Sequence, residues 1–155
     1  MTEPTRIAFV CVENAGRSQM AAAVARHLVA ERDLEDAIEV HSGGTDPGEA
    51  VHPVVVEAMA ERDLDLSGTE PRQMPREEVM AMDYVITMGC SAQDVCPATW
   101  RGDSRDWGLD DPGGQPLQVV RGIRDEIERR VEELFEEVLA GDGAETGGPS
   151  LDPEL

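Results

Sequence analysis

The sequence contains no lysine, so all 13 of its basic residues are arginines. They stand against 33 acidic residues, which gives a formal net charge of -20 at pH 7. A surface of this charge repels nucleic acid and anionic membranes, so we expect no partner of either kind. In molar salt the Debye length falls to about 3 Å, which screens the self-repulsion of such a surface. The acidity therefore predicts a halophilic protein from a salt-rich cytoplasm and does not indicate its reaction.

Long apolar runs are also missing. No run of about 18 apolar residues occurs, and the first residues lack the basic and apolar regions of a signal peptide. We therefore expect a cytoplasmic protein without a membrane span. Only three cysteines are present, Cys11, Cys90 and Cys96. An odd number in a reducing compartment argues against a structural disulfide framework and favours reactive thiols or inert buried ones.

Aromatic residues make up only 3% of the 155 residues, so the core must be built from aliphatic side chains. Four apolar runs predict strands, at 6–12, 37–44, 82–89 and 104–109. Helical spacing predicts helices around Met20, Val24 and Leu28, over 52–66, and over 116–139, the last ended by Gly141. The alternation of strands and helices predicts a single doubly wound α/β domain, in which helices flank a four-stranded parallel sheet. We expect this domain to span 1–140, followed by a disordered acidic tail at 141–155.

The first predicted strand leads into the segment CVENAGRS, residues 11–18, which opens the first predicted helix. In sheets of this class, ligands bind at the carboxyl ends of the strands. Unpaired backbone N–H groups at a helix start attract anions, and a glycine lets the backbone come close to them. The guanidinium of Arg17 adds a planar fork of donors that suits a tetrahedral oxyanion. The predicted oxyanion-binding residues are Val12, Glu13, Asn14, Ala15, Gly16, Arg17 and Ser18.

Cys11 stands at the tip of this strand, within the same positive field. That field favours the thiolate form of a cysteine, and Ser18 can either donate a hydrogen bond to the thiolate or cap the helix. Cys11 is then a nucleophile that faces the central atom of a phosphate-like ion. The alternative is a small buried cysteine before an ordinary capped helix, which the position at a strand-to-helix turn disfavours. A proton donor is also needed, and LDDP, residues 109–112, supplies Asp110 and Asp111.

Three motifs together resemble a known family: CVENAGRSQMA, VITMGC with a following CP, and WGLDDP. The sequence is similar over roughly 5–140 to the thioredoxin-coupled arsenate reductases, which share the fold of the low-molecular-weight protein tyrosine phosphatases. The resemblance implies that the chain reduces arsenate to arsenite. It also implies that Asp111, the aspartate before the proline, is the general acid, although Asp110 stays open.

The resemblance further implies roles for the other two cysteines. Cys90 attacks the adduct of arsenic on Cys11, and arsenite departs. Cys96 then attacks the Cys11–Cys90 disulfide and leaves a Cys90–Cys96 disulfide for thioredoxin or a similar thiol reductant. The alternatives are two ordinary cysteines or a zinc pair, and zinc is disfavoured because no further ligand cluster is evident. We expect residues 89–97 to move during this relay.

Two features depart from the family pattern. In better-known members the first relay cysteine takes the place of Gly89, whereas here it sits one position later. Some members also bind potassium through an asparagine that matches Asn14 and a glutamate whose place is taken here by Ala22. We therefore expect no metal and no cofactor. The three histidines, His27, His41 and His52, are scattered in the sequence and are interpreted as structural or exposed.

Two other functions remain as alternatives. One is a phosphatase that acts on tyrosine phosphate or on small phosphoesters. DPGG after the acid and a single tyrosine, Tyr84, disfavour an aromatic-walled phosphotyrosine cleft. The other is an oxyanion sensor without catalysis, which has no use for a nucleophile and an acid together.

Overall fold

The computed structural model describes residues 3–89 and 95–147. Four parallel strands form one sheet in the order β2-β1-β3-β4. They are β1 (Thr5–Cys11), β2 (Ile38–Gly44), β3 (Tyr84–Met88) and β4 (Asp103–Asp106). The predicted four-stranded parallel sheet is confirmed.

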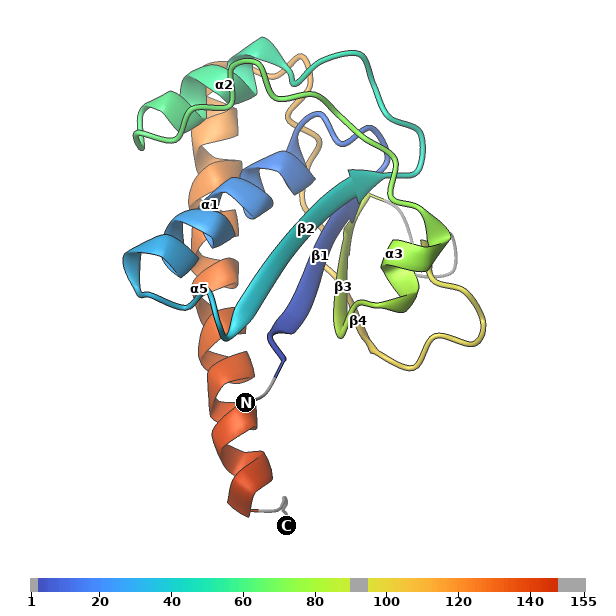
Figure 1. Cartoon of the computed structure of the whole chain (residues 1–155). Coiled ribbons are helices and arrows are strands. Elements are labelled where there is room, and N and C mark those ends of the chain that lie inside the picture. Colours follow the sequence, from blue (N-terminus) through green and yellow to red (C-terminus); the bar gives the residue numbers. More distant parts are fainter. Residues whose placement is uncertain (1–2, 90–94, 148–155) are drawn as a thin grey trace.

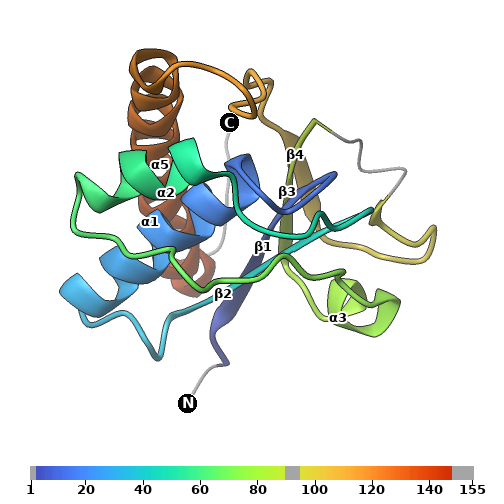
Figure 2. The same cartoon turned by 90° about the horizontal axis from the view of Figure 1, so that it is seen from above.

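Helices cover both faces of this sheet, as Figure 1 and the view from above in Figure 2 show. They are α1 (Arg17–Glu31), α2 (Pro53–Ala60), α3 (Arg76–Met80) and α5 (Leu117–Gly147). The helices α1, α2 and α5 pack together on one face, and α3 lies on the other. Among the described residues, no helix is long and apolar enough to cross a membrane.

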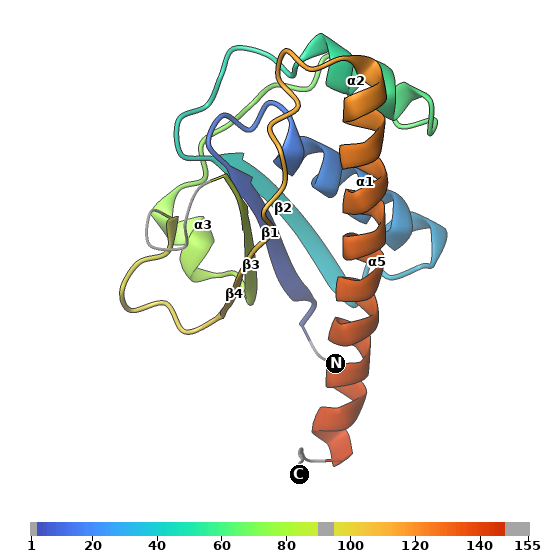
Figure 3. The ribbon, with the colours of Figure 1, turned by 180° about the vertical axis from the view of Figure 1, so that it is seen from behind.

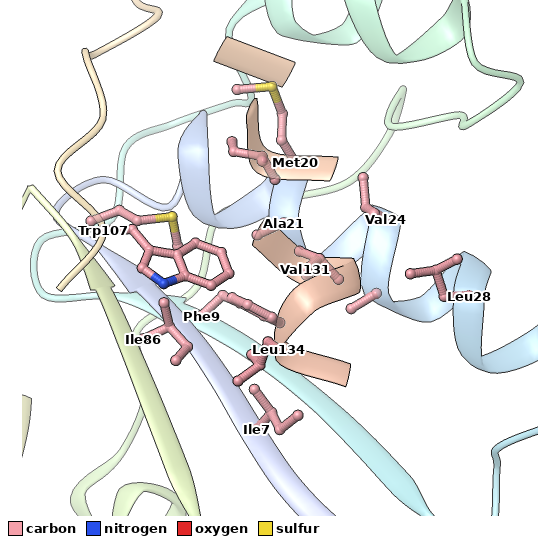
Figure 4. Packing of buried hydrophobic residues seen from close by; sticks show 14 of the residues in the cluster. Ile7, Phe9, Met20, Ala21, Val24, Leu28, Ile86, Trp107, Val131 and Leu134 are labelled. Atoms are coloured by element: carbon pink, nitrogen blue, oxygen red, sulfur yellow. The ribbon is translucent and has the colours of Figure 1, made fainter. Parts of the chain in front are cut away.

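The central strand β1 is buried on both faces, which explains its continuous apolar run. Its side chains alternate: Ile7 and Phe9 belong to a core shared with α1 and α5, whereas Ala8 and Val10 belong to a smaller core against α3. Figure 4 shows the larger core, in which the rings of Phe9 and Trp107 lie 5.9 Å apart between centroids. The predicted apolar face of the last helix is buried, from Val120 through Ile123, Ile127, Val131 and Leu134 to Phe135 and Val138.

The ends of several elements differ from the predictions. The expected helix end at Gly141 is wrong, because α5 continues to Gly147. A glycine inside a helix costs only about 1 kcal/mol relative to alanine, and neighbouring helix-forming residues outweigh that cost. The helix α2 ends at Ala60 rather than at residue 66, since Asp63 adopts a left-handed turn with φ 61°. The single-turn helix α3 was not predicted.

The carboxyl ends of the strands gather the loops of interest at one edge of the sheet. The loop after β1 leads directly into α1, and the segment after β4 runs along this edge to the start of α5 (Figure 3). Cys11, the last residue of β1, pairs in register with Gly44 on one side and with Met88 on the other. The fold therefore holds Cys11 at the middle of the sheet edge where ligands of such folds bind.

Candidate active site

Cys11 is nearly buried, with 3% of its surface exposed. Its Sγ atom lies 2.9 Å from Ser18 Oγ and accepts a hydrogen bond of 3.2 Å from the backbone N–H of Asn14. Ser18 lies inside α1, so it contacts the thiol rather than capping the helix. Two hydrogen-bond donors are thus available to the Cys11 sulfur.

Residues 11–18, which we call the oxyanion loop, are oriented by their carbonyl groups. Four of these carbonyls accept backbone hydrogen bonds of 2.7–3.2 Å from the segment 45–52; the donors are Thr45, Asp46, Gly48 and His52. In a planar trans peptide the following N–H points away from the carbonyl. The N–H groups of the oxyanion loop are therefore turned away from the segment 45–52. The Asn14 amide, which donates to Cys11 Sγ, shows that this other side is the side of the thiol.

Asn14 locks the shape of the oxyanion loop. Its backbone is in the left-handed region, with φ 54°, where asparagine is one of the few tolerated residues. Its buried side chain donates to Ser18 Oγ at 2.7 Å. Its Oδ1 atom accepts from Gln19 Nε2 at 2.9 Å and from the backbone N–H of Arg72 at 3.0 Å. The sequence predicted Asn14 as an oxyanion-binding residue, but this supporting role through its side chain was not foreseen.

Arg17 connects the oxyanion loop to residues 107–113, which we call the acid loop. Its Nη1 donates to the carbonyl of Leu109 at 2.8 Å, and its Nη2 lies 3.9 Å from Asp111 Oδ2. The Arg17 side chain is only 13% exposed, whereas that of Asp111 is 68% exposed. Asp111 also accepts a hydrogen bond from the backbone N–H of Gly113 at 2.9 Å.

Gly89 is required by its contact with Arg17. Its φ is +85°, and a β-carbon added there would lie 2.7 Å from Arg17 Nη2. Because both the backbone conformation and the space exclude a side chain, a cysteine at position 89 would displace the Arg17 guanidinium.

These groups surround one cavity of about 290 Å³, a volume suited to a small oxyanion. It is lined by Cys11, Val12, Glu13, Ala15, Gly16, Arg17, His52, Gly89 and Asp111. Of the two candidate acids, Asp111 is the one that lines it. Asn14 and Ser18 are buried and support Cys11 from within the protein. His52, interpreted from the sequence as structural or exposed, lines the cavity, and no spacing pattern in the sequence pointed to it.

The two predicted relay cysteines are described to different extents. Cys90, like the rest of 90–94, lies outside the described residues, so the expected movement of 89–97 stays a prediction. Cys96 is partly buried, and its burial raises the pKa of its thiol. It packs against the core that contains Ala8 and Val10, whereas Cys11 belongs to the core on the α1 and α5 face. In this structure the two described cysteines therefore belong to opposite faces of the sheet.

The chain belongs to the low molecular weight phosphotyrosine protein phosphatase family, whose family model matches residues 6–143. Within this family, its relatives include arsenate reductases. It is 50% identical over 133 residues to a Halobacterium salinarum protein named "Putative arsenate reductase", covering 86% of this chain and 92% of that protein. The predicted family resemblance and fold are confirmed.

Two solved structures support the same grouping. A structure described as an arsenate reductase in the phosphate binding state has a TM-score of 0.73 and 33% identity, covering 86% of this chain and 98% of that chain. The thioredoxin-dependent arsenate reductase of Corynebacterium glutamicum has a TM-score of 0.73 and 35% identity over 90% of this chain. This chain spans only 64% of that longer chain.

Proposed function

We propose that this chain reduces arsenate to arsenite, with Cys11 as the nucleophile and Cys90 and Cys96 as a disulfide relay. The observation that carries the proposal is the 50% identity to a relative named as an arsenate reductase, which extends over nearly the whole of that relative. The site adds chemical support, because a thiol, a guanidinium and a carboxyl group border one cavity of oxyanion size.

Binding uses the oxyanion loop and Arg17. The amides that face away from the segment 45–52 donate to the oxygens of a tetrahedral anion, and the Arg17 guanidinium supplies paired donors and positive charge. Arg17 is held by the Leu109 carbonyl, so little freedom is lost when the anion binds. The anion is thereby placed with its central atom towards Cys11 Sγ.

The first chemical step forms a bond between Cys11 sulfur and arsenic. The thiolate attacks the arsenic atom of hydrogen arsenate, and the bond from arsenic to the hydroxyl group breaks. Asp111 gives a proton to that leaving group, which departs as water. The product is an arsenic(V) adduct on Cys11.

The next two steps are thiol exchanges. The Cys90 thiolate attacks Cys11 Sγ, a disulfide forms, and the electron pair of the sulfur–arsenic bond passes to arsenic. Arsenic is thereby reduced by two electrons and leaves as arsenite. The Cys96 thiolate then attacks Cys90, which releases Cys11 as a thiolate and forms the Cys90–Cys96 disulfide. A dithiol reductant such as thioredoxin reduces this disulfide.

The setting of the reaction follows from the charge and the cysteines. A relay of this kind needs a reducing compartment, so we place the protein in the cytoplasm. The net charge of -20 suits a salt-rich interior, and the relative from Halobacterium salinarum supports the expected halophilic character.

A second candidate function is hydrolysis of phosphate esters. The family match favours it, and Cys11, Arg17 and Asp111 suffice for it, since water can hydrolyse a phosphocysteine. Among the described residues, the wall of the cavity carries Glu13 and His52 and no phenyl or indole ring that would stack on a phosphotyrosine. We therefore treat phosphatase activity as a side activity of the same site.

The test compares two reactions in molar salt. Arsenate-dependent oxidation of reduced thioredoxin is measured beside hydrolysis of an aryl phosphate, for the native chain and for Cys90→Ser and Cys96→Ser. Each variant should stop multiple turnover of arsenate while aryl phosphate hydrolysis stays within about twofold. Mass spectrometry should find Cys96→Ser stalled as a Cys11–Cys90 disulfide and Cys90→Ser stalled before any disulfide. Normal arsenate turnover by both variants would refute the relay and favour the phosphatase.

A further inference from the structure

The proton balance of arsenate reduction, on which this inference depends through the proposed function, requires more than one delivery of a proton. Hydrogen arsenate and two thiols give neutral arsenite, a disulfide and water only when two further protons are taken up. Asp111 supplies the proton that removes water in the first step. Another proton is needed later, when arsenite leaves with its oxygens protonated. Hydrolysis of a phosphate ester has no equivalent of this second delivery.

His52 is placed to interact with both loops of the cavity. Its backbone N–H donates to the carbonyl of Ala15 at 2.9 Å, which ties it to the oxyanion loop. A β-carbon on Gly16 would lie 3.4 Å from the imidazole Cδ2, and one on Gly113 would lie 2.9 Å from Nε2. The ring therefore sits between the oxyanion loop and the acid loop, where two glycines leave room for it. Its side chain is 30% exposed, so water can reach it.

Charged groups face His52 from each of these elements. Glu13 Oε1 on the oxyanion loop lies 3.9 Å from Nε2. Asp111 Oδ1 lies 3.3 Å from the same β-carbon position on Gly113 that borders Nε2. These two carboxylates place negative charge beside the imidazole. Arg17 in the same cavity and the amino end of α2, where His52 is the N-cap residue, place positive charge near it.

We propose that His52 is the second proton donor of this cavity. As Cys90 attacks Cys11 and arsenic takes up the electron pair, the proton on Nε2 passes to an oxygen of the departing arsenite. The neutral imidazole then regains a proton from water through its exposed edge. Asp111 and His52 thus serve two different steps, and only the first of these steps occurs in phosphate ester hydrolysis.

The variant that tests this role is His52→Gln, which keeps a polar side chain but removes the titrating proton. The kcat and KM for arsenate and for an aryl phosphate are measured across pH, with His27→Gln on the exposed face of α1 as the control. We expect kcat for arsenate to fall about 10- to 100-fold, with KM changed less than about threefold. The fall of kcat with rising pH that a titrating acid causes should disappear. Aryl phosphate hydrolysis should change less than about threefold.

A purely structural role predicts something different. If His52 only wedges the two loops apart, both activities should decline in parallel and the pH dependence of arsenate reduction should keep its shape. That result, or unchanged arsenate reduction in His52→Gln, would overturn the proposal.

Proton NMR supplies a readout that does not need turnover. The chain has three histidines, so the imidazole resonance of His52 is assigned by its loss in His52→Gln. Inorganic phosphate should shift this resonance while those of His27 and His41 stay in place. An unmoved His52 resonance in a chain that reduces arsenate refutes the inference alone. Failure of the native chain to reduce arsenate refutes the proposed function, and the donor role with it.

Discussion

The two loops that form the cavity are held in opposite ways. In the oxyanion loop, Asn14 and Ser18 are fully buried and joined by a hydrogen bond of 2.7 Å, and the backbone is anchored along the segment 45–52. In the acid loop, the Asp111 side chain is 68% exposed and lies 3.9 Å from Arg17. The functional side chains of the oxyanion loop are therefore built into the core, whereas the acid loop is anchored by Trp107 and carries its candidate acid at the surface.

This difference matches the two roles, anion binding and proton donation, that we propose for the site. Donors that stabilise charge are most effective when they are fixed before the reaction, because no reorganisation is then needed. A proton donor must reach the leaving oxygen as its bond breaks and then regain a proton from water, which an exposed carboxyl can do. The comparison predicts that changes at Asn14 in the oxyanion loop affect both folding and reaction, whereas changes at Asp111 in the acid loop affect the reaction alone.

The largest effect is expected from Cys11→Ser. A serine hydroxyl does not ionise in this environment, so both arsenate reduction and aryl phosphate hydrolysis should fall about 10⁵-fold or more, to background. The substitution nearly preserves volume, so inorganic phosphate should still bind by calorimetry. Arsenate turnover above background in this variant would place the nucleophile elsewhere.

Asp111→Asn should come next, with kcat lowered about 10²- to 10⁴-fold for both reactions. Because this side chain is exposed, the melting temperature should stay within about 2 °C of the native value. Asp110→Asn, one residue earlier in the same loop, is the matched control and should keep nearly full activity. Equal losses in the two variants would mean that both carboxyls share the acid role.

Asn14→Ala tests whether the buried side chain of the oxyanion loop is needed for both stability and activity. It leaves the Arg72 amide without its acceptor and places alanine in a left-handed conformation. Gln19 Nε2 loses the side-chain acceptor at position 14 and keeps only the backbone carbonyl of that residue. We expect about 3 kcal/mol of lost stability in urea unfolding and a 10- to 100-fold loss of activity. Asn14→Gly relieves only the backbone conformation. Full recovery in Asn14→Gly would show that the hydrogen bonds of the Asn14 side chain contribute little.

The smallest effect concerns the ion pairs behind the oxyanion loop. Burial opposes ionisation of Glu78, but hydrogen bonds from Arg72 and His41 outweigh it and lower the pKa of Glu78 below its usual 4.5. A carboxyl with a depressed folded-state pKa adds stability above the unfolded pKa and loses it as pH falls through the folded value.

Glu78→Gln should therefore cost about 1 kcal/mol at pH 7, and the difference from the native chain should vanish as pH falls below 4.5 through the lowered folded-state pKa. Thermal unfolding across pH measures this difference. Glu77→Gln, an exposed residue of α3 with the same change of charge, is the control. A deficit in Glu78→Gln that persists at low pH would point to packing rather than to charge.

Much of this architecture could be predicted from local patterns. The buried run ending at Cys11 predicted the central strand, because a strand covered on both faces needs apolar residues at every position. Arg17 and the loop before it could be assigned because the helix start defines their geometry. The end of α5 could not be predicted in this way. Glycine is typical of helix ends, yet α5 continues past Gly141 to Gly147.

The positions of His52 and Arg72 at the site could not be predicted from the sequence. Both reach the site from segments far from residues 11–18 in the chain, through contacts that follow from how the loops after β2 fold back on the oxyanion loop. No periodicity encodes such contacts. From the sequence, the candidate general acid could be narrowed to Asp110 or Asp111. Only the three-dimensional path of the acid loop shows that Asp111 is the one that lines the cavity.

The location of Cys96 has a kinetic consequence. Cys96 packs with the core on the α3 face, whereas Cys11 opens into the cavity at the sheet edge from the opposite core. In the proposed relay, arsenate reacts at the cavity with the reduced chain, whereas the reductant reacts with the Cys90–Cys96 disulfide. A high concentration of arsenate should saturate the cavity without shielding the protein from its electron donor. Steady-state rates measured against both substrates should then give parallel double-reciprocal lines, with neither substrate acting as a competitive inhibitor of the other.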